Sequence, residues 1–406
     1  MMHLGRYALM GGVLSAAGLP LYIHAPKVYA DSYGVSLASL GAVLFGLRLL
    51  DVVQDPLLGR LASALKHRRG LAIAVAFLVM ALGMLGLLGI DPPVAPLSWF
   101  ALTLTLVFSA FSFLTICFYA QGAARGEAMA HGGHVQLARW RETGALTGVC
   151  LAAILPTILS GYAGFAVIFA IACGAATFAM RREWQPLPTS ADNDFGTVLK
   201  DQIARRLLLV ALLNAAPVAV SSTLFLFFVE SRLAAPGWEG PLLLVFFLSA
   251  AVAAPVWGAL AMRHPPRRVL LWGMGLAVAS FSLALTLGPG DQWIFAIVCL
   301  TSGAALGADL TLLPALFSRR MAQIAPDAAQ GFALWSFASK FTLALAAVLI
   351  FPLLDLAGFV SGTENTASAL TTLSLLYAAA PCVLKLGAMA LLATTSLSDH
   401  QMEPPR

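Results

Sequence analysis

Charged residues are scarce in this sequence: Asp, Glu, Lys and Arg make up 11% of its 406 residues, whereas soluble domains carry about 25%. Hydrophobic residues account for 60% of the chain. Apolar runs of about 20 residues, the length needed to cross a bilayer core, recur from one end to the other. This composition excludes an ordinary soluble domain and predicts an all-α membrane protein that crosses the bilayer many times.

Cysteine is also rare, and its spacing predicts neither a disulfide framework nor a zinc site. All cysteines lie inside apolar runs, where we expect them to pack as small hydrophobic side chains; they are Cys117, Cys150, Cys173, Cys299 and Cys382. Nucleotide-binding loops and nucleophile elbows are missing as well. We therefore expect neither an enzyme active site nor an organic cofactor.

Basic residues are concentrated in alternate loops, and the opposite loops offer Lys27 and Arg232. The basic side carries Arg60, Lys66, Arg68, Arg69, Arg125, Arg139, Arg181, Arg182, Lys200, Arg205, Arg206, Arg263, Arg267, Arg268, Arg319 and Arg320. By the positive-inside rule, this asymmetry predicts a bacterial-type inner-membrane protein with cytoplasmic basic loops and termini. The net charge of +5 then reflects topology, and we expect the lipid bilayer rather than nucleic acid as a partner.

Twelve membrane helices are expected from the apolar runs. The first run is too long for a signal-peptide core and does not end in a cleavage site, so it counts as a helix. The expected spans are 7–29, 37–59, 71–90, 97–120, 140–160, 163–181, 206–229, 241–262, 269–288, 292–316, 331–355 and 367–393.

A polar, proline-containing segment at 182–205 separates two expected six-helix halves, 1–181 and 206–406. A weak repeat supports this division: PLLGRLA begins at Pro56 and PVWGALA at Pro255, and a basic cluster follows each. Repeated halves with a binding site between them are typical of secondary transporters. Since one chain supplies both halves, we expect a monomer that binds a small-molecule solute.

The second expected helix carries Arg48, Asp51 and Asp55, which share one helical face. Charges at membrane depth are costly, so this face is expected to point into the bundle. Arg48 can neutralise one carboxylate, which leaves the other for a proton or for a hard cation such as Na⁺. The alternative is that Asp55, near the cytoplasmic end, makes only a gating contact.

The stretch RLLDVVQDPLLG, from Arg48, resembles the helix-2 signature of the glycoside-pentoside-hexuronide:cation symporters, the melibiose permease type. ICFYAQGAA, LARWRETGALTG, TLFLFFVE and ALWSFASKFTLALA are similar to later blocks of that family, in the same order. The resemblance implies the major facilitator fold and cation-coupled symport by alternating access. It also implies a cation site at Asp51 and Asp55, with Lys340 nearby.

The family's sugar-binding carboxylates on helices 1 and 4 are replaced here by Ser15 and Thr115. The resemblance therefore implies a small solute, of which a sugar or glycoside is one example. Amphipathic, lipid-like and organic-anion solutes are alternatives, because carboxylates that bind several hydroxyls are missing. A membrane protein that keeps the fold without transporting is a further alternative.

Other ionisable residues inside the expected spans have open roles. Lys340 can pair with Asp51 or Asp55, or else with Asp309. Asp309 can bind solute or hold Lys340 or Lys385. For Lys385 itself we favour a side chain that reaches toward the cytoplasmic surface.

The remaining candidates are polar or aromatic residues near the expected cavity. Arg141 matches a family arginine, or it is one more cytoplasmic positive charge. His24 is a titratable group near the outer end of the first helix. Tyr119 and Trp335 can stack on a sugar ring or can simply pack between helices.

Overall fold

The structure is a computed structural model of residues 1–406. It describes residues 2–18, 21, 25–35, 37–129, 133–159, 161–184, 195–324, 328–359 and 365–395. Within these ranges the chain consists of helices and short connections, with no β-strand. The predicted all-α class is confirmed.

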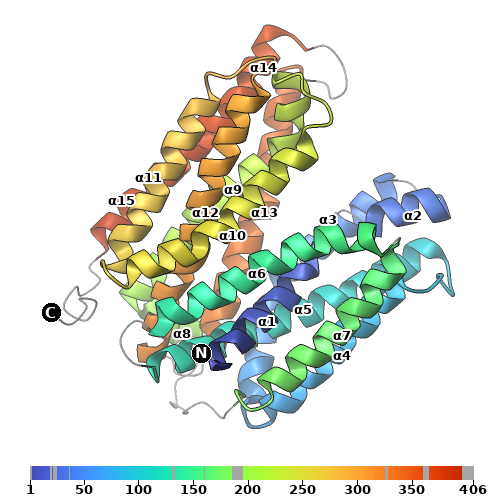
Figure 1. Ribbon diagram of the computed structural model, residues 1–406, viewed down its shortest axis with the longest axis vertical. Coiled ribbons are helices and arrows are strands. Elements are labelled where there is room, and N and C mark those ends of the chain that lie inside the picture. Colours follow the sequence, from blue (N-terminus) through green and yellow to red (C-terminus); the bar gives the residue numbers. More distant parts are fainter. Residues whose placement is uncertain are drawn as a thin grey trace. The chain divides into compact units, whose positions relative to one another are not determined.

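The helices form two compact units. Unit 1 comprises Met1–Val198 and Met321–Phe337, and unit 2 comprises Leu199–Arg320 and Ala338–Arg406. Each unit is a bundle of long helices (Figure 1). Unit 1 thus includes a short segment from late in the sequence, which matters below because it carries Phe332 and Ser336.

Unit 1 begins with two helices where the sequence predicted one at 7–29. Pro26 lies in the first turn of the second, a position that suits proline. Most of the residues that join the two helices lie outside the described ones, so a single span over 7–29 stays a prediction. The unit 1 helices are α1 (Met2–Ala16), α2 (Ala25–Tyr33), α3 (Leu37–Ala64), α4 (Arg69–Leu88), α5 (Pro96–Glu127), α6 (Gly133–Ile158) and α7 (Tyr162–Met180).

Unit 2 begins within the segment predicted as a loop at 182–205. A short helix, α8 (Phe195–Lys200), crosses the unit boundary, and α9 starts at Gln202 because the Asp201 carboxylate accepts a bond from the Ala204 amide at 2.7 Å. The remaining helices are α9 (Gln202–Phe227), α10 (Glu239–Ala261), α11 (Pro266–Ala284), α12 (Gln292–Ile324), α13 (Ala329–Leu356), α14 (Ala367–Ser374) and α15 (Ala380–Thr394).

Seven helical segments within the described ranges are long and apolar enough to cross a membrane. They are Lys66–Leu88, Pro96–Glu127, Tyr162–Met180, Gln202–Arg232, Glu239–Ala261, Gln292–Ile324 and Ala367–Thr394. The other expected spans correspond to α1 with α2, α3, α6, α11 and α13. The multi-pass prediction is confirmed, and the count of twelve is consistent with these elements.

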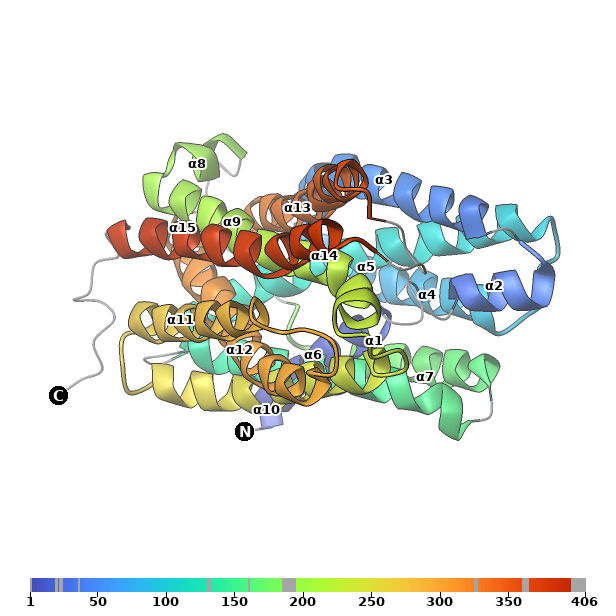
Figure 2. The same ribbon diagram turned by 90° about the horizontal axis from the view of Figure 1, so that it is seen from above.

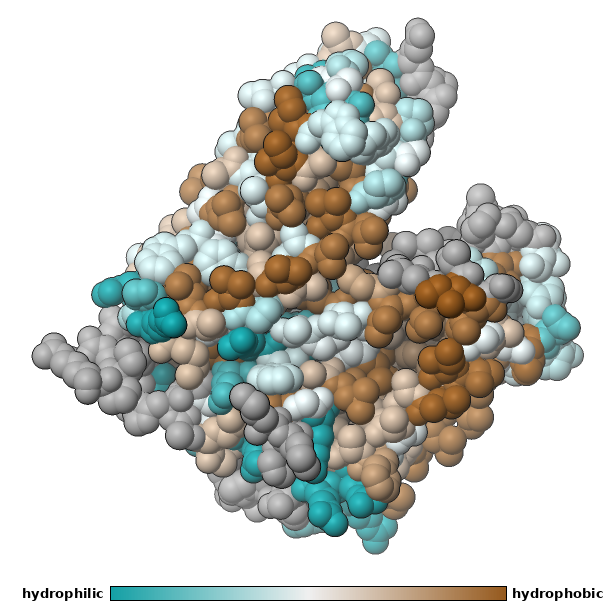
Figure 3. Space-filling view, in the orientation of Figure 1, coloured by the Kyte–Doolittle hydropathy of each residue, from teal (hydrophilic) through white to brown (hydrophobic). Residues whose placement is uncertain are grey.

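The outer surface of the helices is apolar, as lipid contact requires. On α10, exposed Leu244, Leu248, Val252 and Val256 recur every fourth residue and form one stripe. Hydrophobic side chains cover much of the middle of the helices in Figure 3, and hydrophilic ones gather toward their ends. Exposed apolar area of this extent marks a membrane-facing surface.

Glycine pairs spaced four residues apart bring helices close together in both units. A Cβ at Gly144 of α6 would meet the backbone of Ala8, and one at Gly148 would meet that of Gly12 on α1. In unit 2, Gly303 and Gly307 of α12 lie in the same way against the backbone of α10. Small residues at this spacing are the usual means of close helix packing in membranes.

Unit 2 also contains two wide helical turns that pack against each other. The turn Phe228–Arg232 continues α9, and the turn Leu375–Ala379 joins α14 to α15. Both are π-helical, and the Phe228 and Tyr377 rings stack with centroids 4.2 Å apart and planes 15° apart. The helices α9, α14 and α15 that carry these turns are shown from above in Figure 2.

Candidate functional site

Asp55 is fully buried within α3 of unit 1. The Ser336 hydroxyl, on the part of α13 that belongs to unit 1, donates to Asp55 Oδ2 at 2.7 Å. A buried carboxylate requires such donors, because losing hydration without compensation costs several kcal/mol, roughly 2–7 even for a neutral polar group. Pro56 follows directly and has no amide hydrogen to donate to the carbonyl of residue 52.

Glycine at position 59 allows α13 to approach Asp55. A Cβ at Gly59 would overlap the Ala333 methyl group. Asp55 lies one turn before Gly59, and Ser336 lies one turn after Ala333, so the close approach aligns the carboxylate with the hydroxyl. The last residue of the motif RLLDVVQDPLLG thus has a packing role beside the carboxylate.

A second polar group in unit 1 consists of Tyr119 on α5 with Arg141 and Glu142 on α6. The Arg141 Nε donates to Glu142 Oε1 at 2.6 Å, and the Tyr119 hydroxyl donates to the same oxygen at 3.3 Å. The guanidinium also lies over the Tyr119 ring, 3.9 Å from its centroid, a cation–π arrangement. Arg141 and Glu142 are both buried, so the group is charge-neutral inside the bundle.

Two donors near this group have no hydrogen-bond partner among the described residues. They are Arg141 Nη2 and the hydroxyl of Thr115, which lies one turn before Tyr119. Unsatisfied buried donors are rare in proteins and often mark a place where water or a ligand binds. Arginine and hydroxyl groups of this kind suit the oxygen atoms of a polar solute.

One helix links the Asp55 site with the Tyr119 group. Phe332 on α13 packs on the Tyr119 ring with centroids 5.2 Å apart, and Ser336, one turn later, donates to Asp55. Residues four apart lie on one helical face. The two contacts therefore lie on adjacent turns of the same face of α13.

The roles of several other predicted site residues stay predictions. Ser15 is half-buried on α1, and Trp335 and Lys340 are half-buried on α13. The side chains of Arg48 and Asp51 and all of His24 lie outside the described residues. Their proposed pairing and cation ligation are therefore untested.

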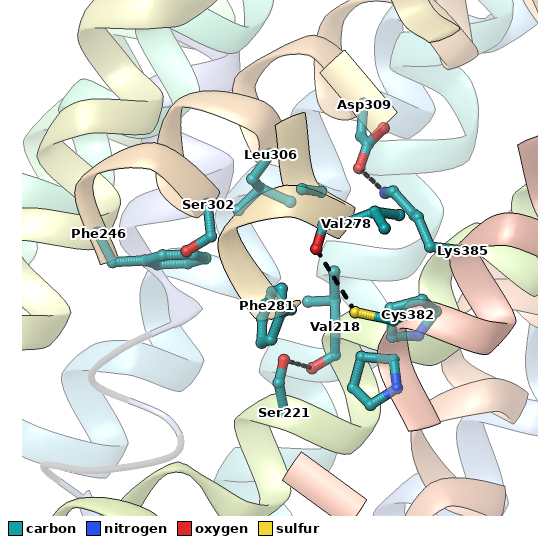
Figure 4. A pocket seen from close by; sticks show the side chains of 13 residues that line it. Val218, Ser221, Phe246, Val278, Phe281, Ser302, Leu306, Asp309, Cys382 and Lys385 are labelled. Atoms are coloured by element: carbon teal, nitrogen blue, oxygen red, sulfur yellow. Dashed lines mark hydrogen bonds and ion pairs between the residues drawn. The ribbon is translucent and has the colours of Figure 1, made fainter. Parts of the chain in front are cut away.

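Unit 2 holds a buried ion pair in the middle of its bundle. Lys385 on α15 donates to Asp309 Oδ2 on α12 and, at 2.6 Å, to Asn214 Oδ1 on α9. All three side chains are buried, and Figure 4 shows Asp309 and Lys385 pointing toward one another. The prediction that Lys385 reaches toward the cytoplasmic surface is wrong, because the carboxylate offers the ammonium better compensation inside the bundle. Of the roles predicted for Asp309, the structure shows the pairing with Lys385.

A small cavity of about 30 Å³, room for about two water molecules, adjoins this pair. Its walls are mostly apolar, as Phe246, Phe281 and Leu306 illustrate (Figure 4). Asp309 Oδ1 has no hydrogen-bond partner within the described residues. An unpaired carboxylate oxygen thus adjoins an apolar chamber.

The cytoplasmic ends predicted from charge also carry ion pairs. In unit 1, Glu183 accepts from Arg6 at 2.9 Å and lies 3.8 Å from Arg125. In unit 2, Arg320 Nε donates to Asp201 Oδ1 at 3.0 Å. The bonds from Arg320 lower the pKa of the Asp201 carboxyl below its ordinary value.

Sequence reasoning missed three residues of the unit 1 site: Glu142, Phe332 and Ser336. Glu142 could have been found, because it is an acid inside the expected span 140–160 and such acids are costly. Phe332 and Ser336 carry no such signal, since apolar and hydroxyl residues are common in membrane helices. Across the described residues there is no cluster of three or more His, Cys, Asp or Glu that could hold a metal ion.

The apolar outer surface, the buried charges inside each bundle and the repeated small-residue packing define a polytopic transporter of the major facilitator fold. The chain belongs to the MFS/sugar transport protein family, whose sequence model matches residues 7–399. This membership agrees with the melibiose permease resemblance and assigns the chain to secondary transport of small solutes rather than to catalysis. No curated protein matches the chain.

Solved structures confirm the fold at low sequence identity. A bacterial homologue of the iron transporter ferroportin is 15% identical with a TM-score of 0.71, covering 97% of this chain and 98% of its own. The E. coli fucose:proton symporter is 14% identical with a TM-score of 0.69, covering 98% of both chains. The human organic anion transporter TETRAN is 16% identical with a TM-score of 0.64, covering 96% and 98%.

Proposed function

We propose that this protein is a cation-coupled symporter for a small hydroxylated solute, with the coupling ion, Na⁺ or H⁺, bound at Asp55 and Asp51. The observation that carries the proposal is the buried Asp55 carboxylate, which accepts from the Ser336 hydroxyl. Ser336 lies one helical turn after Phe332, which packs on the Tyr119 ring. The family's description as sugar transport proteins supports the solute class.

The cation site rests on charge and oxygen ligands. An ionised carboxylate inside a membrane bundle costs a few kcal/mol, about 2.5–3.5 on insertion scales, and a bound cation offsets that cost. Occupation by the cation changes the hydrogen bonds that Asp55 accepts, and Ser336 carries the change into α13. Coupling follows because cation and solute then favour the same conformations.

The solute site rests on Tyr119, Arg141 and Thr115. The Arg141 Nη2 and Thr115 Oγ1 groups lack partners among the described residues and can serve solute hydroxyls. Arg141 lies over the Tyr119 ring and Glu142 accepts from its hydroxyl, so Tyr119 holds the Arg141–Glu142 pair in place beside the solute. These groups replace the carboxylates that bind sugars elsewhere in the family.

The proposed orientation places both termini and the basic helix ends on the cytoplasmic face of a bacterial inner membrane. The basic residues Arg125, Arg320 and Arg181 lie at or just beyond the ends of α5, α12 and α7. One chain carries both groups of helices, and we propose a monomer as the working unit.

The test is solute uptake into vesicles of both orientations with imposed Na⁺ or H⁺ gradients. The panel holds monosaccharides, glycosides, organic anions and lysolipids, and the comparison is wild type with Asp55→Asn. We expect one hydroxylated solute to accumulate only with a gradient. Asp55→Asn should abolish accumulation, by about 100-fold or more, because loss of coupling removes the driving force.

Asp91→Asn is the matched control, since Asp91 lies outside the helices and is exposed. Wild-type accumulation in the control shows that the change of charge alone does not impair the protein. Gradient-driven uptake that survives Asp55→Asn would rule out the coupling site. A complete lack of response to any gradient would favour a membrane protein that keeps the fold without transporting.

An amphipathic or organic-anion solute is the second candidate class. The specific observation in its favour is the Lys385 ammonium, which is buried in unit 2 among mostly apolar side chains. Gradient-driven uptake of a lysolipid or an organic anion, with no sugar responding, would select this class.

A further inference from the structure

A groove runs along the outer surface of unit 2 between α10 and α12. Its volume is about 670 Å³, within the usual range for ligand pockets, about 300–1,000 Å³. The α10 wall extends from Val245 to Leu260, and Leu300 and Ala304 form the α12 wall. A helix covers about 22 Å between the two ends of the α10 wall, more than the hydrocarbon depth of one leaflet, about 15 Å. The groove is therefore long enough for a lipid chain.

The polar side chains that line this groove already make hydrogen bonds within the protein. The Ser249 hydroxyl donates to the Phe246 carbonyl at 2.9 Å. The Trp257 indole donates to the Ala304 carbonyl at 2.7 Å. A polar solute would leave its own donors and acceptors unpaired against these walls, at a cost for each. The walls therefore suit a hydrocarbon chain.

A cluster of basic residues lies at one end of the groove. The amides of Arg263 and His264 bond to the Leu260 carbonyl, each at 3.0 Å, so the helical winding continues past the last lining residue of α10. Arg263 and His264 are exposed there, and Arg268 is exposed in the first turn of α11. Figure 3 shows hydrophobic side chains along α10 and hydrophilic ones where α10 meets α11.

Two arginines of this cluster are available to a ligand. Neither Arg263 nor Arg268 makes an ion pair or a side-chain hydrogen bond with the described residues. Arg267, which lies between them in sequence, already donates to the Thr395 carbonyl at 3.1 Å. No acidic residue occurs between Glu239 and Asp291, so this stretch supplies no carboxylate that competes for the arginines. Arginine pairs well with phosphate oxygens.

Trp272 indicates the depth of the cluster in the membrane. It is exposed on α11, one turn after Arg268, and its ring contacts that of His264 with centroids 5.5 Å apart. Tryptophan is enriched at the level of the lipid head groups. The arginines therefore lie at the depth of a phospholipid phosphate, directly beyond a groove that suits its acyl chain.

We propose that this groove binds one anionic phospholipid, with an acyl chain between α10 and α12 and the phosphate on Arg263 and Arg268. The lipid is a structural ligand and not the transported solute, so the site does not depend on the proposed coupling reaction. A zwitterionic lipid fits less well, because its ammonium would lie beside two arginines in a stretch without acidic residues. In the proposed orientation the lipid belongs to the cytoplasmic leaflet.

A second copy of the chain fits this face less well than a lipid. Two copies that lie in the same membrane orientation and share the face would bring their basic clusters to the same end of the interface. Arg263 and Arg268 of one copy would then lie near those of the other, and like charges repel. An anionic lipid instead compensates the charge.

The test titrates the full-length protein in detergent with dioleoyl-phosphatidylglycerol and follows the lipid adducts by native mass spectrometry. We expect one adduct to form at a lower lipid concentration than the others. Dioleoyl-phosphatidylcholine, the zwitterionic counterpart, should bind on the order of tenfold more weakly. Inorganic phosphate should not compete, because the groove binds the acyl chain.

Arg263→Gln combined with Arg268→Gln tests the head-group contacts. Each basic residue near a membrane surface contributes about fivefold to the binding of an anionic lipid, so phosphatidylglycerol should bind about 30-fold more weakly to the double variant. Arg181→Gln combined with Arg182→Gln is the matched control, since both arginines are exposed just beyond the end of α7. This control should bind phosphatidylglycerol as wild type does.

Ala253→Phe tests the acyl-chain contact and leaves the arginines in place. Ala253 lines the groove, and a phenyl ring there would occupy space that the chain needs. We expect the first adduct of both lipids to weaken about tenfold or more, because the apolar contacts of the chain are lost. Ala259→Phe is the matched control, since Ala259 is exposed on α10 outside the groove lining.

Several results would overturn the proposal. They are equal affinity of wild type for the two lipids, an unchanged first adduct in the Arg263 and Arg268 double variant, and equal loss in the two arginine double variants. A dimer in the native spectrum that Ala253→Phe dissociates would assign the groove to a second copy. If Ala253→Phe does not fold, the arginine variants decide the question, because their substitutions lie on the surface.

Discussion

The two units pack their helices in the same way but treat buried charge differently. Gly144 and Gly148 in unit 1, like Gly303 and Gly307 in unit 2, let two helices meet backbone to backbone. In unit 1 the Asp55 carboxylate accepts from a neutral hydroxyl, and Arg141 pairs with its own neighbour. In unit 2 the Asp309 carboxylate on α12 pairs directly with the Lys385 ammonium on α15.

This difference indicates what each site can exchange. The hydroxyl that donates to Asp55 carries no charge, so breaking that bond does not change the charge of the site. The Asp309 carboxylate belongs to a neutral pair with Lys385, so a change of charge on either member leaves the other uncompensated inside the bundle. The fold therefore supplies close packing in both units, and the partner of each acid sets the chemistry.

The largest expected effect is on the free energy of unfolding, and it concerns the acid that pairs with a lysine, Asp309. Lys385→Gln leaves Asp309 buried without its counter-ion, which costs about 3–5 kcal/mol for a buried pair. We expect a large fall in the thermal unfolding midpoint of the purified protein. The double change Asp309→Asn with Lys385→Gln should recover most of it, and a single variant as stable as wild type would contradict the buried pairing.

The second prediction concerns the packing that both units share. Gly144→Ala places a methyl group against the backbone of Ala8, and overpacking of this kind costs about 1–3 kcal/mol. We expect a lower unfolding midpoint for this variant. Gly174→Ala is the matched control, because a Cβ there meets no atom within 4 Å; equal effects of the two changes would argue against close α1–α6 packing.

The sequence was sufficient for the fold and for part of the sites. Apolar runs predicted the spans, and the cost of membrane-depth charge pointed to Asp55 and Asp309. The pairing of Lys385 could not be predicted, because Asp309, Asn214 and Lys385 come from three helices far apart in sequence. The Arg141–Glu142 pair was unexpected for another reason: adjacent residues on a helix point in different directions. The Arg141 guanidinium nevertheless bonds to Glu142 while it lies over the Tyr119 ring.

The third prediction tests whether unit 1 binds solute through Arg141. Arg141→Lys keeps the positive charge but loses the planar fork of donors. We expect the half-saturating concentration of the solute identified in vesicles to rise about tenfold, equivalent to about 1.4 kcal/mol. Arg139→Lys is the control on the same helix, and equal behaviour of both variants would count against a solute contact.

The smallest effect is expected at the Asp201–Arg320 pair of unit 2. Arg320 lowers the pKa of Asp201, so the pair stabilises the fold above the unfolded carboxyl pKa, about 3.9, and is lost as pH falls through the folded value. Asp201→Asn keeps an N-cap but removes the charge. Its cost at pH 7 should stay below about 1 kcal/mol, because the pair is half-buried at the end of a helix and water still reaches it.

Unfolding midpoints measured from pH 7 downward check this prediction. Wild type should converge with Asp201→Asn in acid, because both then carry an uncharged side chain at this position. A difference that stays constant across the pH range would mean that capping rather than charge stabilises the start of α9.

The two π-helical turns of unit 2 have a consequence for register along the bundle. Each turn closes with a bond to the fifth residue, as from the Leu233 amide to the Phe228 carbonyl at 3.0 Å, so each holds one residue more than an α-helical turn. Removing one residue from either turn would rotate the following part of that helix by about 100°. Since the Phe228 and Tyr377 rings stack across the two turns, removing a residue from one turn alone would disrupt the packing of the helix that follows it.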